Sequence, residues 1–469
     1  MRFLPEEEQQ RLLAACFAQS HLTPEQLWMR YFALGGSLSL LDLDAYLNGL
    51  TALPRLDRDM LAHAVNERLD ELSGPPRAPY SHSVRDAKPL HGPLKALVDL
   101  LEGAHRAPPE RLPAIVAEAG RALDLRIGIY LADYDQRTLV PLRAESAVGL
   151  DIETTVAGDV FRRAGTTVTR DGPDPTLWAV LLDGVERLGV LEIVPTDGAD
   201  PDDPVLREQC RWLSALLGHL VTITTQYGDG LDVRRRRRHR ASPAELLWQN
   251  LPPLTGATES VVVGGSVQPA YDLGGVVFDY ALSERRAQLA MFDAGARSST
   301  SSYAVVNALA AYRAARRDGA SLAEQYIAVG KELDDRASAV TGVVAELDLR
   351  TGVLRWLDAG HPAPLIVRDG APLPGTGAVA ARFAADEQSL RATEVHLRPG
   401  DVLAVYSRGL AETTDRAGAP FGRDRVAEYL ADEVLPPETA RRLTQAVLSH
   451  GGGDLHHDAG VLVARWLER

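Results

Sequence analysis

Apolar residues recur with helical spacing in the first part of the chain. Thr23–Gln26 has the composition of a helix start, with an N-cap Thr, a Pro at the first helical position and a capping-box Gln. Gly35-Gly36 predicts where this helix ends. Two sets of apolar-face positions have helical spacing: Leu27, Arg30, Tyr31 and Leu34, and then Leu61, Ala64, Val65, Arg68, Leu69 and Leu72. Residues 1–72 are therefore predicted to be an all-helical interaction or dimerisation module.

Residues 73–92 are rich in Pro, Ser and Gly, which predicts a linker. Helical spacing resumes at Leu94 and continues through Leu101. The region 93–227 then mixes helix and strand, and two of its strands flank an Asp183-Gly184 turn as in a β-hairpin. Its predicted elements are a helix over 115–122 and strands over 127–131, 177–182 and 188–194.

Seven residues, Arg234–Arg240, form a basic run with one His, and Ser242-Pro243 then predicts a helix start. A charge run is usually a solvated face or linker, and that is the expectation for 228–250. Contact with an acidic partner is the alternative. Strand-like apolar runs follow from residue 251 to the end, among them 261–263, 287–293 and 402–405.

Composition limits the function classes. The chain has 469 residues, 45% hydrophobic and 24% charged, which predicts two or three soluble globular domains. A formal net charge of −14 argues against general nucleic-acid binding. Cys16 and Cys210 form no metal or disulfide pattern and are expected in cores. With no secretory signal pattern and no ~20-residue apolar run, no membrane association and a cytoplasmic location are expected.

The region 93–227 resembles a GAF domain, a sensory α+β fold. The motifs that carry the resemblance are Thr155–Phe161 (TVAGDVF) and Glu186–Leu191 (ERLGVL). The resemblance implies a small-molecule ligand of unknown identity, because the region has no chromophore-type Cys and no cyclic-nucleotide signature.

Residues 251–469 resemble the SpoIIE/RsbU-like, PPM-type metal-dependent serine/threonine phosphatases. Four motifs stand in the family's order: 269–279, 287–293, 356–365 with its intact AGHPAP, and 398–412 ending in Tyr406–Glu412 (YSRGLAE). The resemblance implies an α/β/β/α sandwich of two antiparallel sheets flanked by helices. The chain as a whole is then an α+β protein: a helical unit, a GAF-like domain and a PPM-type domain.

The family binds two Mn²⁺ or Mg²⁺ ions through four aspartates, and this chain keeps one of those positions. Asp293 matches the second aspartate, whereas Val276, Arg408 and His457 stand at the other three. Hard divalent cations need oxygen ligands, which Val cannot supply and which His replaces poorly. Unit charges interact by about 4 kcal/mol at ~4 Å and an effective dielectric constant of ~20, so Arg408 should repel a cation strongly. No cofactor is therefore expected, with Mn²⁺ or Mg²⁺ implied only for an active enzyme.

The charge at Arg408 suggests a second hypothesis, in which its guanidinium pairs with Asp293 and with Asp458; the alternative is that it points to solvent. Asp293, with Asp279 and Asp458 as weaker candidates, is the predicted metal position. Asp279 and Glu412 match further acidic positions of the family. His361 is expected to be a packed turn residue, and His456 and His457 loop residues.

Three functions remain open. The first is a pseudophosphatase that binds a partner-switching phosphoprotein, or an anti-anti-sigma-like regulator, under control of the GAF-like domain. The second is an active phosphatase with a remodelled site drawn from Asp279, Asp293, Glu412, His457 and Asp458. The third makes the GAF-like domain a small-molecule sensor on a dimerisation scaffold. A homodimer is an open alternative for the oligomeric state.

Overall fold

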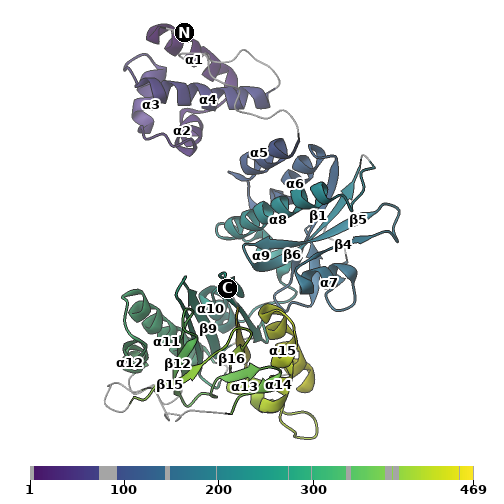
Figure 1. Cartoon of the computed structure of the whole chain (residues 1–469). Helices are drawn as coiled ribbons and strands as arrows, with labels where there is room; N and C mark the ends of the chain where they lie inside the picture. The colour runs from purple at the N-terminus through teal and green to yellow at the C-terminus, as the bar shows by residue number, and fades with distance from the viewer. Residues whose placement is uncertain are drawn as a thin grey trace. The chain divides into compact units, whose positions relative to one another are not determined.

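The computed structural model describes residues 5–72, 92–142, 148–196, 198–272, 274–296, 298–333, 340–374, 383, 390–453 and 455–467 (Figure 1). The predicted linker 73–92 lies outside these residues, apart from Gly92. The chain divides into two compact units, Met1–Pro89 and Leu90–Arg469.

The first unit is helical. It consists of α1 (Glu6–Ser20), α2 (Pro24–Ala33), α3 (Leu40–Leu47) and α4 (Arg55–Glu71). The capping box predicted at α2 is present, because Thr23 accepts from the Gln26 N–H and the Gln26 side chain accepts from the Thr23 N–H. The core between these helices contains Leu27, Tyr31, Leu61, Val65 and Leu69, which were predicted from helical spacing, together with Cys16.

The region that resembles a GAF domain, residues 93–227, keeps the name GAF-like region and is built on one six-stranded antiparallel sheet in the order β3-β2-β1-β6-β5-β4. One face carries α5, α6 and α8, and the other carries α7. The strands are β1 (Leu125–Ala132), β2 (Thr138–Pro141), β3 (Leu150–Asp151), β4 (Thr166–Thr169), β5 (Thr176–Asp183) and β6 (Glu186–Pro195). The helices are α5 (Gly92–Ala104), α6 (Leu112–Arg121), α7 (Val156–Arg163) and α8 (Pro204–Thr225).

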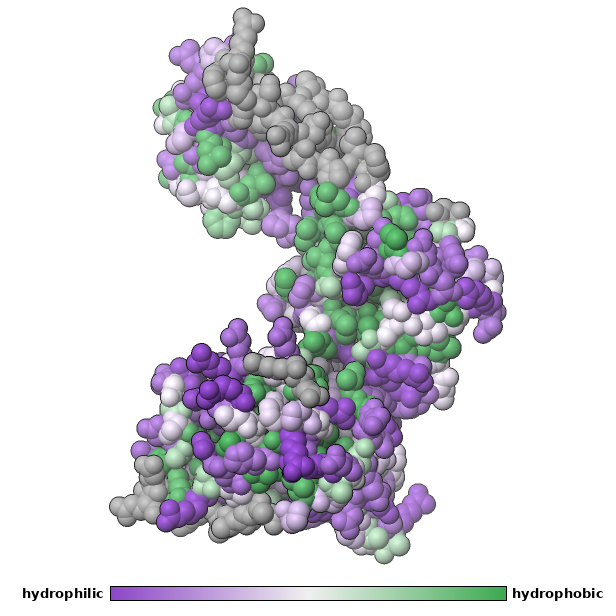
Figure 2. All heavy atoms as spheres, in the orientation of Figure 1, coloured by the Kyte–Doolittle hydropathy of each residue, from purple (hydrophilic) through white to green (hydrophobic). Residues whose placement is uncertain are grey.

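An apolar stripe runs along the outside of α8 and continues on α5. Val205, Trp212 and Ile223 are half or more exposed and recur at spacings of 7 and 11 residues, which places them on one side of the helix. Leu94 and Leu101 on α5 are also exposed. Figure 2 shows apolar residues gathered over these two helices. Exposed apolar residues grouped on one side of a helix differ from the singly scattered ones of ordinary surfaces.

The C-terminal region is a four-layer sandwich. One antiparallel sheet has the order β15-β12-β11-β10-β9, with α11 and α12 packed on its outer face. The other has the order β14-β13-β16-β17-β8-β7, with α14 and α15 packed on it. The predicted α/β/β/α fold is therefore confirmed. The strands are β7 (Thr255–Ala257), β8 (Val261–Gln268), β9 (Val276–Leu282), β10 (Arg286–Asp293), β11 (Thr341–Asp348), β12 (Val353–Ala359), β13 (Leu365–Arg368), β14 (Ala371–Pro372), β15 (Thr393–His396), β16 (Val402–Tyr406) and β17 (Ala459–Trp466). The helices are α11 (Ser299–Arg317), α12 (Leu322–Leu333), α13 (Arg408–Glu412), α14 (Gly422–Ala431) and α15 (Pro436–His450).

The basic run is only partly the solvated linker that was expected: Arg237, Arg238 and His239 are exposed, whereas Arg240 is buried. Its first two residues end α9 (Gly230–Arg235), and the run leads into α10 (Ser242–Asn250). The Arg240 side chain is 3% exposed, and its guanidinium carbon lies 4.2 Å from the Tyr134 ring centre and 5.1 Å from that of Trp248. Tyr134 belongs to the GAF-like region and Trp248 to α10. Arg240 therefore forms a packed joint, because cations over aromatic faces are attracted by the ring quadrupole.

Candidate functional site

The site predicted around Asp293 is built from segments at the ends of β10, β12 and β16 and from those just before β9 and β17. Asp293 is the last residue of β10, and Val276, the first of β9, is its register partner. The Asp293 carboxylate is buried and accepts the N–H of Gly295 at 2.6 Å and that of Arg408 at 3.3 Å. Burial raises the pKa of the Asp293 carboxyl, and the charge of Asp458 adds to this, against the lowering effect of the two N–H donors.

Asp458, directly before β17, is a second buried carboxylate of the site. One of its oxygens accepts the N–H groups of Gly274 and Gly275 at 2.8 and 2.7 Å. Its own carbonyl accepts the hydroxyl of Ser407 at 2.9 Å. Gly409 is needed beside it, because a Cβ there would lie 2.4 Å from that carbonyl oxygen.

Arg408 contacts Asp293 through its backbone and not through its guanidinium. The side chain is exposed, and its Nη2 donates to the Gly360 carbonyl at 3.1 Å. Among the described residues, no ion pair joins Arg408 to Asp293 or to Asp458. The prediction of a bidentate ion pair is therefore wrong, because the contact is made by the backbone N–H of Arg408. The charge of the guanidinium still lowers the pKa of Asp293 slightly.

The remaining predicted histidines differ in environment. His457 is exposed, and its Nδ1 lies 2.6 Å from the Gly295 carbonyl oxygen. His456 and Glu412 are exposed as well. His361 is buried with its Nδ1 3.3 Å from the Thr341 hydroxyl, and burial, followed by the charge of Arg408, lowers the pKa of His361 to about 3. His361 is therefore a neutral packed residue at ordinary pH, as the turn-residue interpretation expects.

Asp279 does not belong to this site. Residues alternate across β9: Phe278 packs toward β8 of the facing sheet, so Asp279 faces α11 on the other side. There its two carboxylate oxygens pair with Arg313 at 2.6 Å and Arg316 at 2.7 Å. Its proposed part in a rebuilt ligand set is therefore corrected: both oxygens are already held by arginines.

The residues present do not fit a two-ion Mn²⁺ or Mg²⁺ centre. The Asp293 and Asp458 carboxylates are held by backbone N–H donors, and Val276 places methyl groups against Gly460. In the described part of the chain, no cluster of three or more His, Cys, Asp and Glu side chains is arranged to hold a metal ion.

No described helix is long and apolar enough to span a bilayer.

Several residues that shape the site were not found from the sequence. Gly274 and Gly275 were noted as part of a motif, but their N–H groups, which hold Asp458, carry no side-chain signal. Ser407 links the end of β16 to β17, because it donates to Asp458 and accepts from the Gly460 N–H at 2.9 Å. A serine directly after a buried strand, as in the YSRG motif, could have indicated this link, because a buried hydroxyl needs hydrogen-bond partners.

The sheet order and the four flanking helices define a PPM-type fold. A family model described as Stage II sporulation protein E (SpoIIE) matches residues 285–467. The C-terminal part of the chain is therefore a SpoIIE/RsbU-like domain of PPM type. No curated protein matches the chain.

Three solved structures are similar to this part of the chain. The RsbU and RsbW domains of a Mycobacterium tuberculosis protein share 20% identity over 44% of this chain and 62% of theirs, with a TM-score of 0.38. The SpoIIE phosphatase domain with a regulatory fragment from Bacillus subtilis shares 16% over 45% and 66%, with a TM-score of 0.40. The SiaA PP2C domain of Pseudomonas aeruginosa shares 19% over 44% and 86%, with a TM-score of 0.38. The chain thus spans less than two thirds of the first two.

Proposed function

We propose that this protein is a signalling regulator whose SpoIIE/RsbU-like domain binds a phosphoprotein without dephosphorylating it. The partner would be an anti-anti-sigma-like or related partner-switching regulator, and the GAF-like region would control the contact. The alternative is an active Mn²⁺- or Mg²⁺-dependent phosphatase with a remodelled site.

One observation carries the proposal: backbone N–H groups hold the carboxylate of Asp293, the one retained family metal position, and that of Asp458 beside it. Two divalent ions about 3.5–4 Å apart would activate water and stabilise the phosphoryl transition state. Here Val276 and Arg408 offer no oxygen ligand at two of the four family positions. The exposed Arg408 guanidinium keeps free donors that suit a phosphate group.

The first test is hydrolysis of a phosphoserine peptide by the full chain with and without Mn²⁺. We expect no Mn²⁺-dependent rate above that of the Asp293→Asn variant. A Mn²⁺-dependent rate that Asp293→Asn abolishes would refute the pseudophosphatase proposal and support the alternative.

The second test is binding, measured by fluorescence anisotropy with a labelled phosphoserine peptide and its unphosphorylated twin. We expect the phosphopeptide to bind more tightly, and Arg408→Gln to weaken it about tenfold, since one charge-assisted hydrogen bond contributes about 1.5–3 kcal/mol. Arg416→Gln, on the exposed loop after α13, is the matched control. Equal binding of both peptides would count against a phosphate-reading role.

The ligand implied by the GAF resemblance remains part of the proposal. Both faces of the GAF-like sheet are covered by buried apolar side chains. A groove of about 870 Å³ lies instead between this region and the C-terminal domain, lined among others by Tyr134, Glu186, Trp248, Leu254 and Tyr280. A small molecule that raises the melting temperature of the full chain, but not that of Leu254→Trp, would identify this groove as its site.

The homodimer also remains a proposal, with the exposed stripe of Val205, Trp212 and Ile223 as the surface that would pair. Light scattering at increasing protein concentration tests it. We expect a dimer mass that Trp212→Glu converts to a monomer mass, and a monomer at all concentrations would exclude this state.

A further inference from the structure

The turn between β1 and β2 of the GAF-like region, residues 133–137, is gripped by two elements of the C-terminal domain. The Asp135 carbonyl accepts Nε2 of Gln445, on α15, at 2.7 Å, and Nε2 of Gln268, at the end of β8, at 3.4 Å. Arg137 completes the grip, because its Nε donates to Oε1 of Gln445 at 2.9 Å. One turn therefore touches both a helix and a strand of the neighbouring domain.

The turn has a fixed shape of its own. The Asp133 side chain is buried and accepts the N–H groups of Arg137 at 2.8 Å and Thr138 at 3.2 Å. Gln136 adopts a φ of 52°, a left-handed conformation that persists in a non-Gly residue only where the surroundings hold it. A shift of β1 or β2 would therefore move the turn as a unit.

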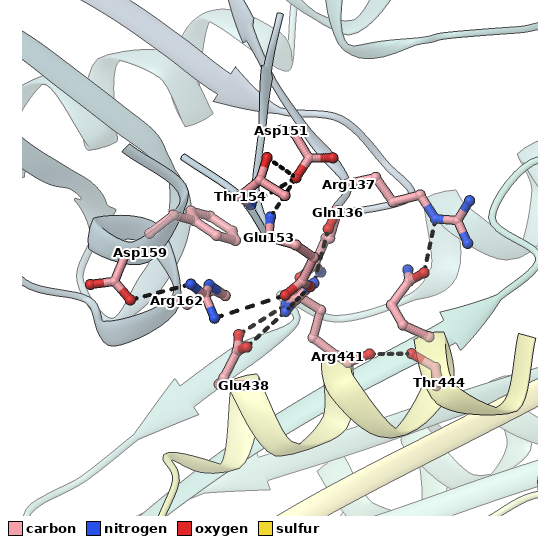
Figure 3. Close-up of polar contacts among 12 residues, drawn as sticks. Gln136, Arg137, Asp151, Glu153, Thr154, Asp159, Arg162, Glu438, Arg441 and Thr444 are labelled. Carbon is pink, nitrogen blue, oxygen red and sulfur yellow. Dashed lines mark hydrogen bonds and ion pairs between the residues drawn. The ribbon is translucent and has the colours of Figure 1, made fainter. Parts of the chain in front are cut away.

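A buried ion network fixes α15 beside this turn (Figure 3). Arg441 pairs with Glu438 at 2.8 Å and with Glu153 of the GAF-like region at 2.6 Å, and it donates to the Gln136 carbonyl at 3.3 Å. Glu438 in turn pairs with Arg187 of β6 at 3.1 Å. Because Arg187, Glu438 and Arg441 are all buried, separating the two regions would leave charges unpaired, which is strongly unfavourable.

Strand β8, which holds the turn through Gln268, leads directly to the candidate site. Gln268 is the register partner of Ala459, the residue after Asp458. Helix α15 is tied to the same strand by the 2.8 Å hydrogen bond between Thr444 and Ser266. Two contacts therefore connect the Asp135 carbonyl to the neighbourhood of Asp458. The first is the hydrogen bond from the Gln268 side chain, and the second is the pairing of β8 with β17.

We propose that the β1–β2 turn is the output element of the GAF-like region, and that Gln268 and Gln445 are positioning residues through which it sets the hydrogen bonds of Asp458. A change in the sheet that withdraws the turn would loosen the end of β8 and with it the bonds from Gly274 and Gly275 to Asp458. The inference deepens the proposed function, since it takes the Asp458 site as the one regulated.

Amide hydrogen exchange on the full chain tests the proposal. Gln445→Glu keeps the acceptor for Arg137 but replaces the donor to Asp135 with a carboxylate oxygen. Gln268→Glu likewise removes the second donor and keeps an oxygen that accepts the Ala270 N–H. We expect exchange of the Gly274 and Gly275 amides to become at least tenfold faster in each variant. The matched control is Gln288→Ala, which loses one side-chain hydrogen bond to Glu346 on the other sheet.

Exchange at Gly274 and Gly275 that equals the control in both variants would overturn the proposal. Faster exchange throughout the chain would indicate general destabilisation. In that case the deciding variant is Arg137→Gln, which removes only the hydrogen bond from Arg137 to Gln445. If this variant does not change exchange at Gly274 and Gly275, the inference is also overturned. The measurement needs neither metal nor phosphopeptide. Its outcome is therefore independent of whether the domain binds or hydrolyses phosphoprotein.

Discussion

Arg408 illustrates how a side chain and its backbone can act separately. Its N–H donates to Asp293, a contact that any residue except proline could make at this position, whereas its guanidinium points to the Gly360 carbonyl and solvent. The exposed side chain can therefore be exchanged without removing the hydrogen bond that holds Asp293. Its charge then becomes the variable that decides whether a cation can approach.

The first prediction concerns this charge. Replacing Arg408 by Asp removes a repulsive cation and adds an oxygen ligand, so Mn²⁺ affinity, measured by calorimetric titration of the full chain, should rise at least tenfold, or about 1.4 kcal/mol. Arg408→Ser, which removes the charge but adds no carboxylate, should give a smaller gain. Equal affinities for the wild type and both variants would contradict the charge argument.

The second prediction concerns Asp279, which neutralises two arginines of α11 in a buried setting. Asp279→Asn should destabilise the protein by about 3–5 kcal/mol, because Arg313 and Arg316 lose their counter-ion. Urea unfolding measures the change. Asp272→Asn, at an exposed pair with Arg238, should change the free energy of unfolding by less than about 1 kcal/mol. A loss of less than about 1 kcal/mol for Asp279→Asn would show that water solvates Arg313 and Arg316 in the variant.

At the level of elements, α15 lies unusually close to β8. Gly264 makes this approach possible: a Cβ there would lie 2.3 Å from the backbone of Pro437, the second residue of the helix. The same helix carries Glu438, Arg441 and Gln445. The close packing of its first turn on β8 therefore fixes the position of α15, and with it the position of the charged side chains that contact the GAF-like region.

The third prediction follows from this packing. Gly264→Ala should push α15 away from β8 and cost about 1–3 kcal/mol in the free energy of unfolding, measured by urea denaturation. Gly165→Ala is the control, since a Cβ at Gly165 meets no atom within 4 Å. If the two variants unfold alike, the strand accommodates the methyl group and the packing argument fails.

Sequence patterns were informative for elements and less so for contacts between them. The sandwich was expected from the resemblance of the ordered motifs to a known family and not from alternation, because strands such as β16 are buried on both faces. The joint formed by Arg240 could not be predicted, since Tyr134 lies more than 100 residues earlier. The Asp293–Arg408 ion pair failed because residue type does not determine whether a side chain or its N–H reaches the partner.

At the scale of the whole molecule, the seam between the GAF-like region and the C-terminal domain contains a carboxyl group poised to titrate. Glu186, at the start of β6, accepts the N–H of Thr255 across the seam. Burial raises the pKa of Glu186 from 4.5 to about 7, although Arg187 and Arg235 act in the opposite direction. The folded chain therefore binds a proton that the unfolded chain has released between these two pH values.

The fourth prediction is a pH dependence with a definite sign. The contribution of Glu186 to stability is complete below pH 4.5, falls as the pH rises to 7, and is lost above it. Relative to wild type, Glu186→Gln should therefore gain about 2–3 kcal/mol in the free energy of unfolding between pH 5 and pH 8. Parallel stability–pH curves for the two proteins would show that Glu186 ionises normally in the folded state.

The hydrogen bonds that hold residues 133–137 determine which sensor regions could replace the GAF-like region in a chimeric protein. Both glutamines bond to a main-chain carbonyl, so what they recognise is the shape of the turn and the place of its oxygen. Gln445 also bonds to Arg137, and the ion network reaches Glu153 and Arg187, so a few side chains must be carried along. A different sensor sheet that offers the same turn and these three residues should be interchangeable with this one, which makes the seam a natural boundary for building chimeric regulators.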